Sequence, residues 1–170
     1  TLQVSAGSTY YLVVEGDATS DAGSYTLSGA LNAEGPQERC PGQEVRWTGA
    51  GPFSFTEQGD TSAQFHELGA ACSSGTAPDA VYAVTAPADG RLQLVLDTAG
   101  DFDAALAVRS ACAEEGSEID CADTATASGP EQLTLQVSEG VTYHVVVDGS
   151  TSAQSGSFAL SGVLNVEGAE

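Results

Sequence analysis

The stretch of sequence that decides the fold occurs twice. Residues 1–35 are TLQVSAGSTYYLVVEGDATSDAGSYTLSGALNAEG, and residues 134–168 are TLQVSEGVTYHVVVDGSTSAQSGSFALSGVLNVEG. They align without a gap at an offset of 133, and 20 of the 35 positions are identical. Self-similarity at a fixed offset is typical of a repeat architecture. We therefore expect a tandem repeat with a period of 133 residues, in which 36–170 is one complete repeat and 1–35 is the tail of a preceding one.

Each copy contains an alternating run that predicts a β-strand, at 9–14 and at 142–147. In the first run, Tyr10, Leu12 and Val14 share one face of the strand, because successive side chains of a strand point to opposite sides. We expect this face to be the core face. The side chains assigned to the opposite face, open to solvent or to an interface, are Tyr11, Val13, His144 and Val146.

Further short strands are predicted between clusters of Gly, Pro, Asp and Ser, and no stretch has a sustained helical period. Short strands spaced by roughly 8 to 12 residues are typical of sandwiches and jelly rolls. The sequence therefore predicts an all-β fold, an antiparallel β-sandwich with a jelly-roll-like arrangement. The predicted strands are 44–48, 53–56, 80–86, 91–97, 104–109, 132–138 and 157–164.

The charge balance excludes two classes of partner. The chain has 24 Asp and Glu residues against four Arg and no Lys, which gives a net charge of −20. So acidic a chain is repelled by phosphate backbones, and we expect no nucleic-acid partner. We also expect no membrane insertion, because no apolar run approaches the roughly 20 residues of a spanning helix.

The cysteines point to an exported protein. Cys40, Cys72, Cys112 and Cys121 form an even set without a C-x-x-C spacing, which favours two disulfides in an oxidising compartment over zinc. Four cysteines permit three pairings. We expect Cys112 to pair with Cys121 across a short loop and Cys40 to pair with Cys72. Because Thr1 is no initiator Met, we also expect a piece excised from a longer chain, located outside the cell or on a bacterial surface.

Asp101, Asp103, Asp120 and Asp123 are the candidate metal ligands. Alternating carboxylates on loops supply the hard oxygen ligands that Ca²⁺ prefers, so we consider a calcium site there. The competing interpretation is that these residues only hold turn backbones and keep the surface soluble. No EF-hand loop accompanies them.

No catalytic constellation stands out. His144 is replaced by Tyr11 in the other copy, and a general base is not interchangeable with Tyr. His66 has no nucleophile motif near it. We therefore expect no enzymatic activity. A sugar-binding platform is also disfavoured, because the single Trp47 is expected to be buried.

Residues 77–162 resemble the bacterial pre-peptidase C-terminal domain, which recurs in secreted and surface proteins. The residues that carry the resemblance are Asp79 to Tyr82, the Ala88-Asp89-Gly90 turn, Phe102-Asp103, the loop between Cys112 and Cys121, and Leu135 to Gly149. The resemblance implies a β-sandwich with an accessory, binding or spacer role. A fold by itself does not define an activity.

The first copy of the repeated segment lacks partner strands within this chain, so its apolar face should be exposed. Either it belongs to the preceding domain of a tandem array, or it completes a neighbouring molecule by strand donation. Both interpretations predict a structural stalk, spacer or filament whose partners are other copies of the repeat. The competing functions are an adhesive or ligand-binding module, with or without calcium, and an accessory domain of a secreted peptidase.

Overall fold

The computed structural model describes residues 2, 4, 7–18, 20–29, 31, 35–124 and 129–166. The chain divides into two compact units, Thr1–Asn32 and Ala33–Glu170. Within the described residues, no helix is long and apolar enough to cross a membrane.

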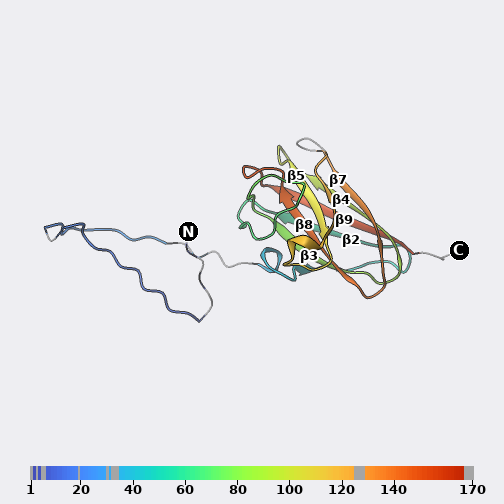
Figure 1. The fold of residues 1–170 in the computed structure, drawn as a ribbon, viewed down its shortest axis with the longest axis horizontal. Coiled ribbons are helices and arrows are strands. Elements are labelled where there is room, and N and C mark those ends of the chain that lie inside the picture. The colour runs from blue at the N-terminus through green and yellow to red at the C-terminus, as the bar shows by residue number, and fades with distance from the viewer. Residues whose placement is uncertain are drawn as a thin grey trace. The chain divides into compact units, whose positions relative to one another are not determined.

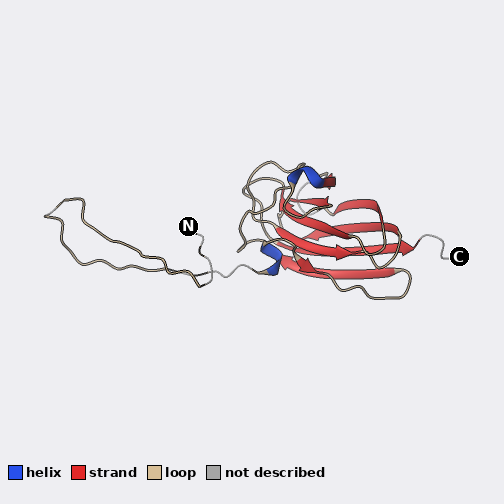
Figure 2. Cartoon of the chain, turned by 60° about the horizontal axis from the view of Figure 1, so that its bottom comes forward, coloured by secondary structure: helices blue, strands red, loops and turns tan. Residues whose placement is uncertain are grey.

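The second unit is a sandwich of two β-sheets, as the sequence predicts (Figures 1 and 2). The five-stranded sheet has the order β1-β3-β8-β5-β6, and the four-stranded sheet has the order β2-β9-β4-β7. Neighbouring strands are antiparallel except β1 and β3. The elements are η1 (Pro36–Glu38), β1 (Gln43–Glu44), β2 (Phe53–Asp60), β3 (Ala80–Thr85), β4 (Gly90–Thr98), β5 (Ala104–Arg109), η2 (Glu115–Ser117), β6 (Glu118–Ala122), β7 (Glu131–Val137), β8 (Thr142–Gly149) and β9 (Ser157–Val166).

The four-stranded sheet has one buried face. Along β7 and most of β4, buried and exposed side chains alternate, with Leu92, Leu94 and Leu96 of β4 turned inward. This is the period of two that one solvated face requires. The inward side chains meet those of the five-stranded sheet in the main core, which includes Phe55 of β2 and Phe158 of β9.

The five-stranded sheet is buried on both faces. Its central strands β3, β5 and β8 are buried almost without interruption. Val145 and Val147 of β8 belong to the main core, whereas Val146 belongs to a second apolar cluster on the opposite face. The remaining buried members of that cluster are Leu68, Ala70, Val81, Ala105, Ala107 and Cys112. The expected core face of β8 is therefore confirmed, and its other face is covered too.

Two predicted details differ. The run 44–48 contributes only Glu44 to the short β1 and an isolated bridge from Thr48 to Ser54, although Val45 and Trp47 both pack against the core. The indole donates to the carbonyl oxygen of Thr85 at 2.7 Å and packs edge-on against Phe55. Strand β6 has no predicted counterpart, since its sequence EIDCA does not alternate. It pairs with β5 at the sheet edge through an irregular register.

The first unit contains no strand among the residues described between 2 and 31. The prediction of a strand at 9–14 is therefore wrong for this unit, which lacks the ladder that its counterpart forms in β8. The reason is that β7, β8 and β9 each pair with strands that lie between Phe53 and Arg109, which the chain contains once. The expected exposure of the apolar side chains of this unit is confirmed.

Candidate functional site

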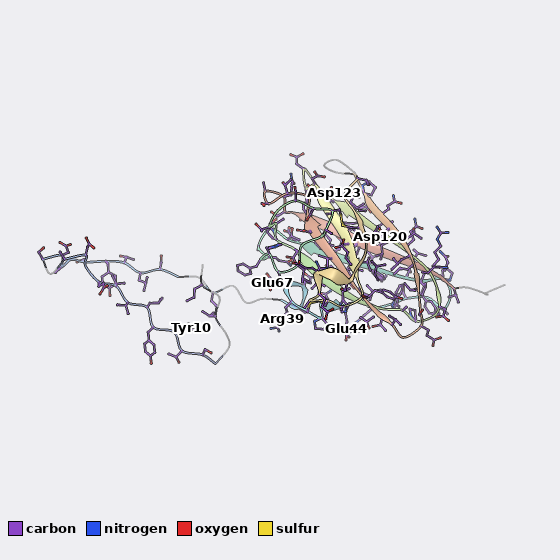
Figure 3. All side chains as sticks on the ribbon, in the orientation of Figure 1. Tyr10, Arg39, Glu44, Glu67, Asp120 and Asp123 are labelled. Atoms are coloured by element: carbon purple, nitrogen blue, oxygen red, sulfur yellow. A yellow bond between two sulfur atoms is a disulfide. The ribbon has the colours of Figure 1, made fainter. Side chains whose placement is uncertain are left out.

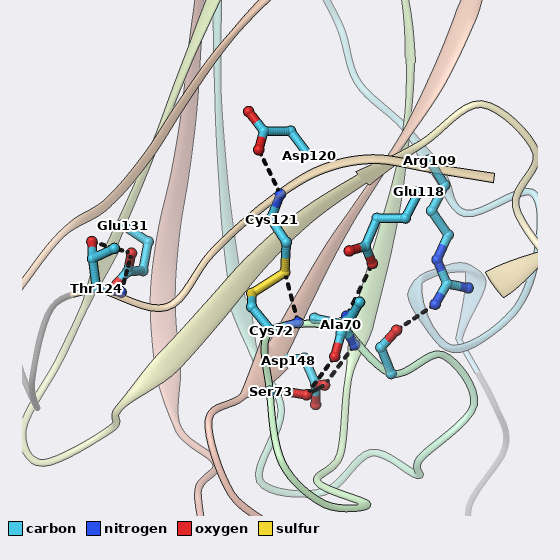
Figure 4. The surroundings of a disulfide bond; sticks show 12 residues. Ala70, Cys72, Ser73, Arg109, Glu118, Asp120, Cys121, Thr124, Glu131 and Asp148 are labelled. Carbon is cyan, nitrogen blue, oxygen red and sulfur yellow. Dashed lines mark hydrogen bonds between the residues drawn. A yellow bond between two sulfur atoms is a disulfide. The ribbon is translucent and has the colours of Figure 1, made fainter. Parts of the chain in front are cut away.

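The outer face of the five-stranded sheet is covered by residues 61–79, here called the latch segment. Two buried carboxylates hold it, Asp79 at its own end just before β3 and Asp148 within β8. Asp79 accepts hydrogen bonds from the main-chain NH groups of Glu67 at 2.6 Å and Leu68 at 3.0 Å. Asp148 of β8 accepts from the NH of Ala70 at 2.9 Å and from the hydroxyl of Ser73 at 2.7 Å (Figure 4). Both carboxylates are fully buried.

Arg109, at the end of β5, holds the same segment from the other side. It is almost fully buried, and its guanidinium donates to the carbonyl oxygens of Gly69 and Cys112. Glu118 of β6 accepts from the NH of Ala71 at 3.0 Å (Figure 4). Sequence reasoning missed Arg109 and Asp148 as functional residues. The available signal was a charged residue at the end of an otherwise apolar strand, since such a residue is seldom buried without partners.

The disulfides tie this cover to the sheet, and the predicted pairing is wrong. Cys40 pairs with Cys112, and Cys72 pairs with Cys121, with Cα atoms 5.7 and 5.9 Å apart. The loop after β5 does not need a local disulfide, because Ser117 already closes it by hydrogen bonds to Ser110 and Ala111. Cys112 and Cys121 instead meet cysteines of the two segments that cover the outer face.

Peptide mapping of the denatured, non-reduced chain tests this pairing. Trypsin cuts after Arg39, Arg46, Arg91 and Arg109, so we expect residues 40–46, 47–91 and 110–170 to be recovered as one disulfide-linked set. A second digestion with a glutamate-specific protease cuts between Cys112 and Cys121. It should leave Cys40 linked to Cys112. Recovery of residues 110–170 free of 40–46 would instead support the pairing expected from the sequence.

The prediction that one face of β8 is open to solvent or to an interface is also wrong, because His144 and Val146 of the second unit are buried. The segment around Cys40 crosses β8, and Nδ1 of His144 lies 2.9 Å from the carbonyl oxygen of Pro41. The next residue, Gly42, has φ +98° and approaches the main chain of Val81 so closely that an added Cβ would lie 2.8 Å from its carbonyl oxygen. Only glycine suits that backbone and that contact. The residues of the first unit that correspond to His144 and Val146 are Tyr11 and Val13, and both are exposed.

The latch has an unusual electrostatic character, because two of its anchors are buried acids that accept mainly from main-chain NH groups. Burial raises the pKa of Asp79 to about 6, and the charge of Asp148 adds to the increase. The hydrogen bonds from the NH groups of Leu68 and Glu67 lower the pKa, but by less than burial raises it. Burial also raises the pKa of Asp148. Nδ1 of His66 lies 3.7 Å from Asp79 and bonds the carbonyl oxygen of Ala77 at 3.0 Å.

The raised pKa of Asp79 predicts that the protein becomes less stable as pH rises from about 4 to about 7. Between its usual pKa of 3.8 and about 6, the folded state binds a proton that the unfolded state has lost, so stability falls as pH increases. The difference is worth roughly 3 kcal/mol. We expect Asp79→Asn to flatten this slope in urea unfolding at pH 4, 5, 6 and 7. Repulsion among the other acids acts in the same direction in both proteins, so an unchanged slope in the variant would contradict the assignment to Asp79.

A polar hollow lies beside the latch, lined by His66, Ser73, Arg109, Glu115 and Glu118 among others. Three of its polar side chains already form hydrogen bonds within the protein. His66 bonds the main chain of Ala77, Arg109 bonds two carbonyls, and Ser73 donates to Asp148. The arrangement therefore fixes the latch segment to the sheet, and none of these hydrogen bonds joins a nucleophilic side chain to His66.

The four candidate calcium ligands are partly brought together. Asp103 and Asp123 are half-buried and near one another, and burial together with the charge of Asp103 raises the pKa of Asp123. Asp101 and Asp120 are exposed, and Asp120 accepts from the NH of Cys121 (Figure 4). Among the described residues, no three acidic, His or Cys side chains form a group that could hold a metal ion. Calcium binding stays a prediction, which melting with and without added CaCl₂ tests.

The first unit presents the largest set of exposed apolar side chains, and Tyr10 projects from its extended ribbon (Figure 3). Ten of its Leu, Val and Tyr side chains are between 44 and 87% exposed. Their counterparts at an offset of 133 are at most 9% exposed. The ten residues are Leu2, Val4, Tyr10, Tyr11, Leu12, Val13, Val14, Tyr25, Leu27 and Leu31.

No family model matches the chain, and no curated protein matches it. Among solved structures, it is similar to the pre-peptidase C-terminal domain of collagenase from Bacillus anthracis, with 11% identity over 73% of this chain and 98% of that chain and a TM-score of 0.47. It is also similar to the Yersinia pseudotuberculosis-derived mitogen, with 14% identity, 70% and 91% coverage and a TM-score of 0.43.

A further similar structure is the PliG inhibitor of g-type lysozyme from Aeromonas hydrophila, a periplasmic protein, with 14% identity over 71% of this chain and 94% of that chain and a TM-score of 0.40. The first of the three belongs to the family that residues 77–162 resemble. All three are likenesses of fold, and they say nothing of activity.

Proposed function

We propose that the chain is a non-enzymatic structural repeat of an extracellular or cell-surface bacterial protein, and that it acts as a stalk or spacer. The observation that carries this proposal is the recurrence of the β7–β9 sequence in residues 1–35. The chain holds one set of partner strands, which pairs with one copy of that sequence. The other copy therefore belongs to another sandwich of the same kind.

The short connection between repeats supports a stiff array. The last residue of β9, Val166, corresponds to Ala33, and η1 begins at Pro36. Only two residues, Glu34 and Gly35, separate these points in the sequence. Three Cα steps span at most about 11 Å, which leaves little room for independent movement of neighbouring sandwiches.

The disulfides of the covering segments and the acidic surface support an extracellular location. The two disulfides join the covering segments to the sheet, and such bonds persist in oxidising compartments. The net charge of −20 keeps copies soluble and apart. The buried charged groups hold the latch rather than a substrate.

Small-angle X-ray scattering on chains of one, two and three consecutive copies of residues 36–168 tests the stalk. This unit has its own two-layer core and both disulfides, so each copy is expected to fold. We expect the maximum dimension to increase by a constant step with each added copy. A maximum dimension that stays constant from two to three copies would show side-by-side packing and contradict the proposal.

A further inference from the structure

We propose that residues 1–32 form the counterparts of β7, β8 and β9 in a second sandwich, whose other strands come from a second copy of residues 36–133 that precedes Thr1 in the same polypeptide. The inference rests on the proposed repeat architecture and names the partner surface of the first unit. That partner is the core of a sandwich that lacks β8, β9 and the second half of β7.

The pairing pattern defines what this partner must supply. β7 pairs with β4, β8 lies between β3 and β5, and β9 lies between β2 and β4. All four partner strands lie within residues 53–109. A copy of residues 36–133 therefore holds every strand that the first unit needs, together with the latch and all four cysteines.

The exposed side chains of the first unit fit this place residue by residue. Leu27 corresponds to Leu160, which is fully buried between Glu57 of β2 and Leu96 of β4. Leu31 corresponds to Leu164, also fully buried. The other counterparts in the main core are Leu135, Val137, Tyr143, Val145, Val147 and Phe158, which match Leu2, Val4, Tyr10, Leu12, Val14 and Tyr25.

At two glycines of the first unit, the absence of a side chain is needed only if the unit packs in such a sandwich. A Cβ on Gly162 of β9 would lie 2.2 Å from the ring of Phe55, so a side chain there displaces that ring. The corresponding Gly29 has nothing within 4 Å of an added Cβ. Gly156 and Gly23 show the same contrast, with Phe102 as the neighbour of Gly156. The first unit thus keeps glycine at both positions against which a second pair of aromatic rings would pack.

A preceding repeat of the same polypeptide is a better partner than a neighbouring molecule. Every complete sandwich carries its own β7–β9 on the same chain, at a high effective concentration. Residues 1–32 of another molecule would have to displace those strands. A preceding copy of residues 36–133 has no other strands to displace, so it is completed by the segment that follows it directly.

The test extends the full chain by placing a second copy of residues 36–133 directly before Thr1. The readout is amide hydrogen exchange at residues 9–14 and 25–29 of the original chain. We expect exchange there to slow by about 100-fold or more relative to the unextended chain, because these amides enter the ladder of a stable sheet. Equal exchange in both chains overturns the proposal.

Charge at two positions requires a second version of the extended chain. Ser150 donates to Asp103 at 2.9 Å, and Gln154 accepts from the NH of Asp103 at 3.0 Å. In the first unit these positions are Asp17 and Asp21, which would place acids beside the added Asp103. The version with Asp17→Ser and Asp21→Gln removes this repulsion. We expect residues 9–14 to be protected in both versions, and more strongly in this one.

Matched substitutions distinguish specific packing from general collapse. Gly29→Ala should reverse the protection in the extended chain at least about tenfold, while the unextended chain keeps its melting temperature. Ser8→Ala, at an exposed position whose counterpart Val141 is also exposed, should leave protection unchanged in both. Protection that survives Gly29→Ala would overturn the assigned register. The stalk proposal has its own test in copies of residues 36–168, which contain no part of the first unit, so the two can fail separately.

Discussion

Replacing Leu160 by Ala is expected to destabilise the protein by about 2–5 kcal/mol, whereas replacing Leu27 by Ala should change its stability by less than about 0.5 kcal/mol. The two leucines occupy equivalent positions of the repeated segment. Leu160 is fully buried in the main core, and its truncation leaves a cavity between the sheets. Leu27 is 59% exposed, so its truncation leaves none.

Urea unfolding of the intact, oxidised chain measures this difference. Val163→Ala is the matched control, because Val163 lies on the same strand as Leu160 but is 38% exposed, and it should cost well under the loss at Leu160. Equal losses at Leu27 and Leu160 would mean that the first unit also packs into a core within this chain. That result would contradict both the exposed state of residues 1–32 and the need for a second set of strands.

The parts of the fold that were predictable are those governed by local alternation. The run 142–147 alternates two sets of side chains, and the set of Tyr143, Val145 and Val147 is the core set of β8. The strand at 104–109 was predicted with the bounds that the structure gives to β5. Period-two patterns report which side chains share a face, and one buried face is enough to produce them.

What the sequence could not show depends on contacts between distant segments. His144 and Val146 were expected on an open face, but the latch segment and the chain around Cys40 cover it. The latch has no strand or helix along most of its length, so no periodicity marks it. The same cover decides the disulfides, because Cys112 and Cys121 meet cysteines that are 72 and 49 residues away. Even cysteine counts predict disulfides but not their pairing.

Removing the disulfides should have the second large effect. The double substitution Cys40→Ser with Cys112→Ser opens a loop with a sequence separation of 72, and Cys72→Ser with Cys121→Ser opens one of 49. In the chain-entropy account, each closure is worth about 4 kcal/mol. Each loss is of the order of the whole stability of a small domain, so we expect the protein without both bonds to be largely unfolded at 37 °C.

Thermal melts of the two double variants, compared with the fully reduced protein, measure this effect. The pairing expected from the sequence would close a local loop between Cys112 and Cys121, whose removal costs less because the loop is short. Single substitutions give the sharper comparison. If Cys40 pairs with Cys112, then Cys112→Ser leaves Cys40 as the free thiol, which iodoacetamide labels at residues 40–46 after tryptic digestion. Labelling at Cys121 instead would show that no disulfide joins the two covering segments to the sheet.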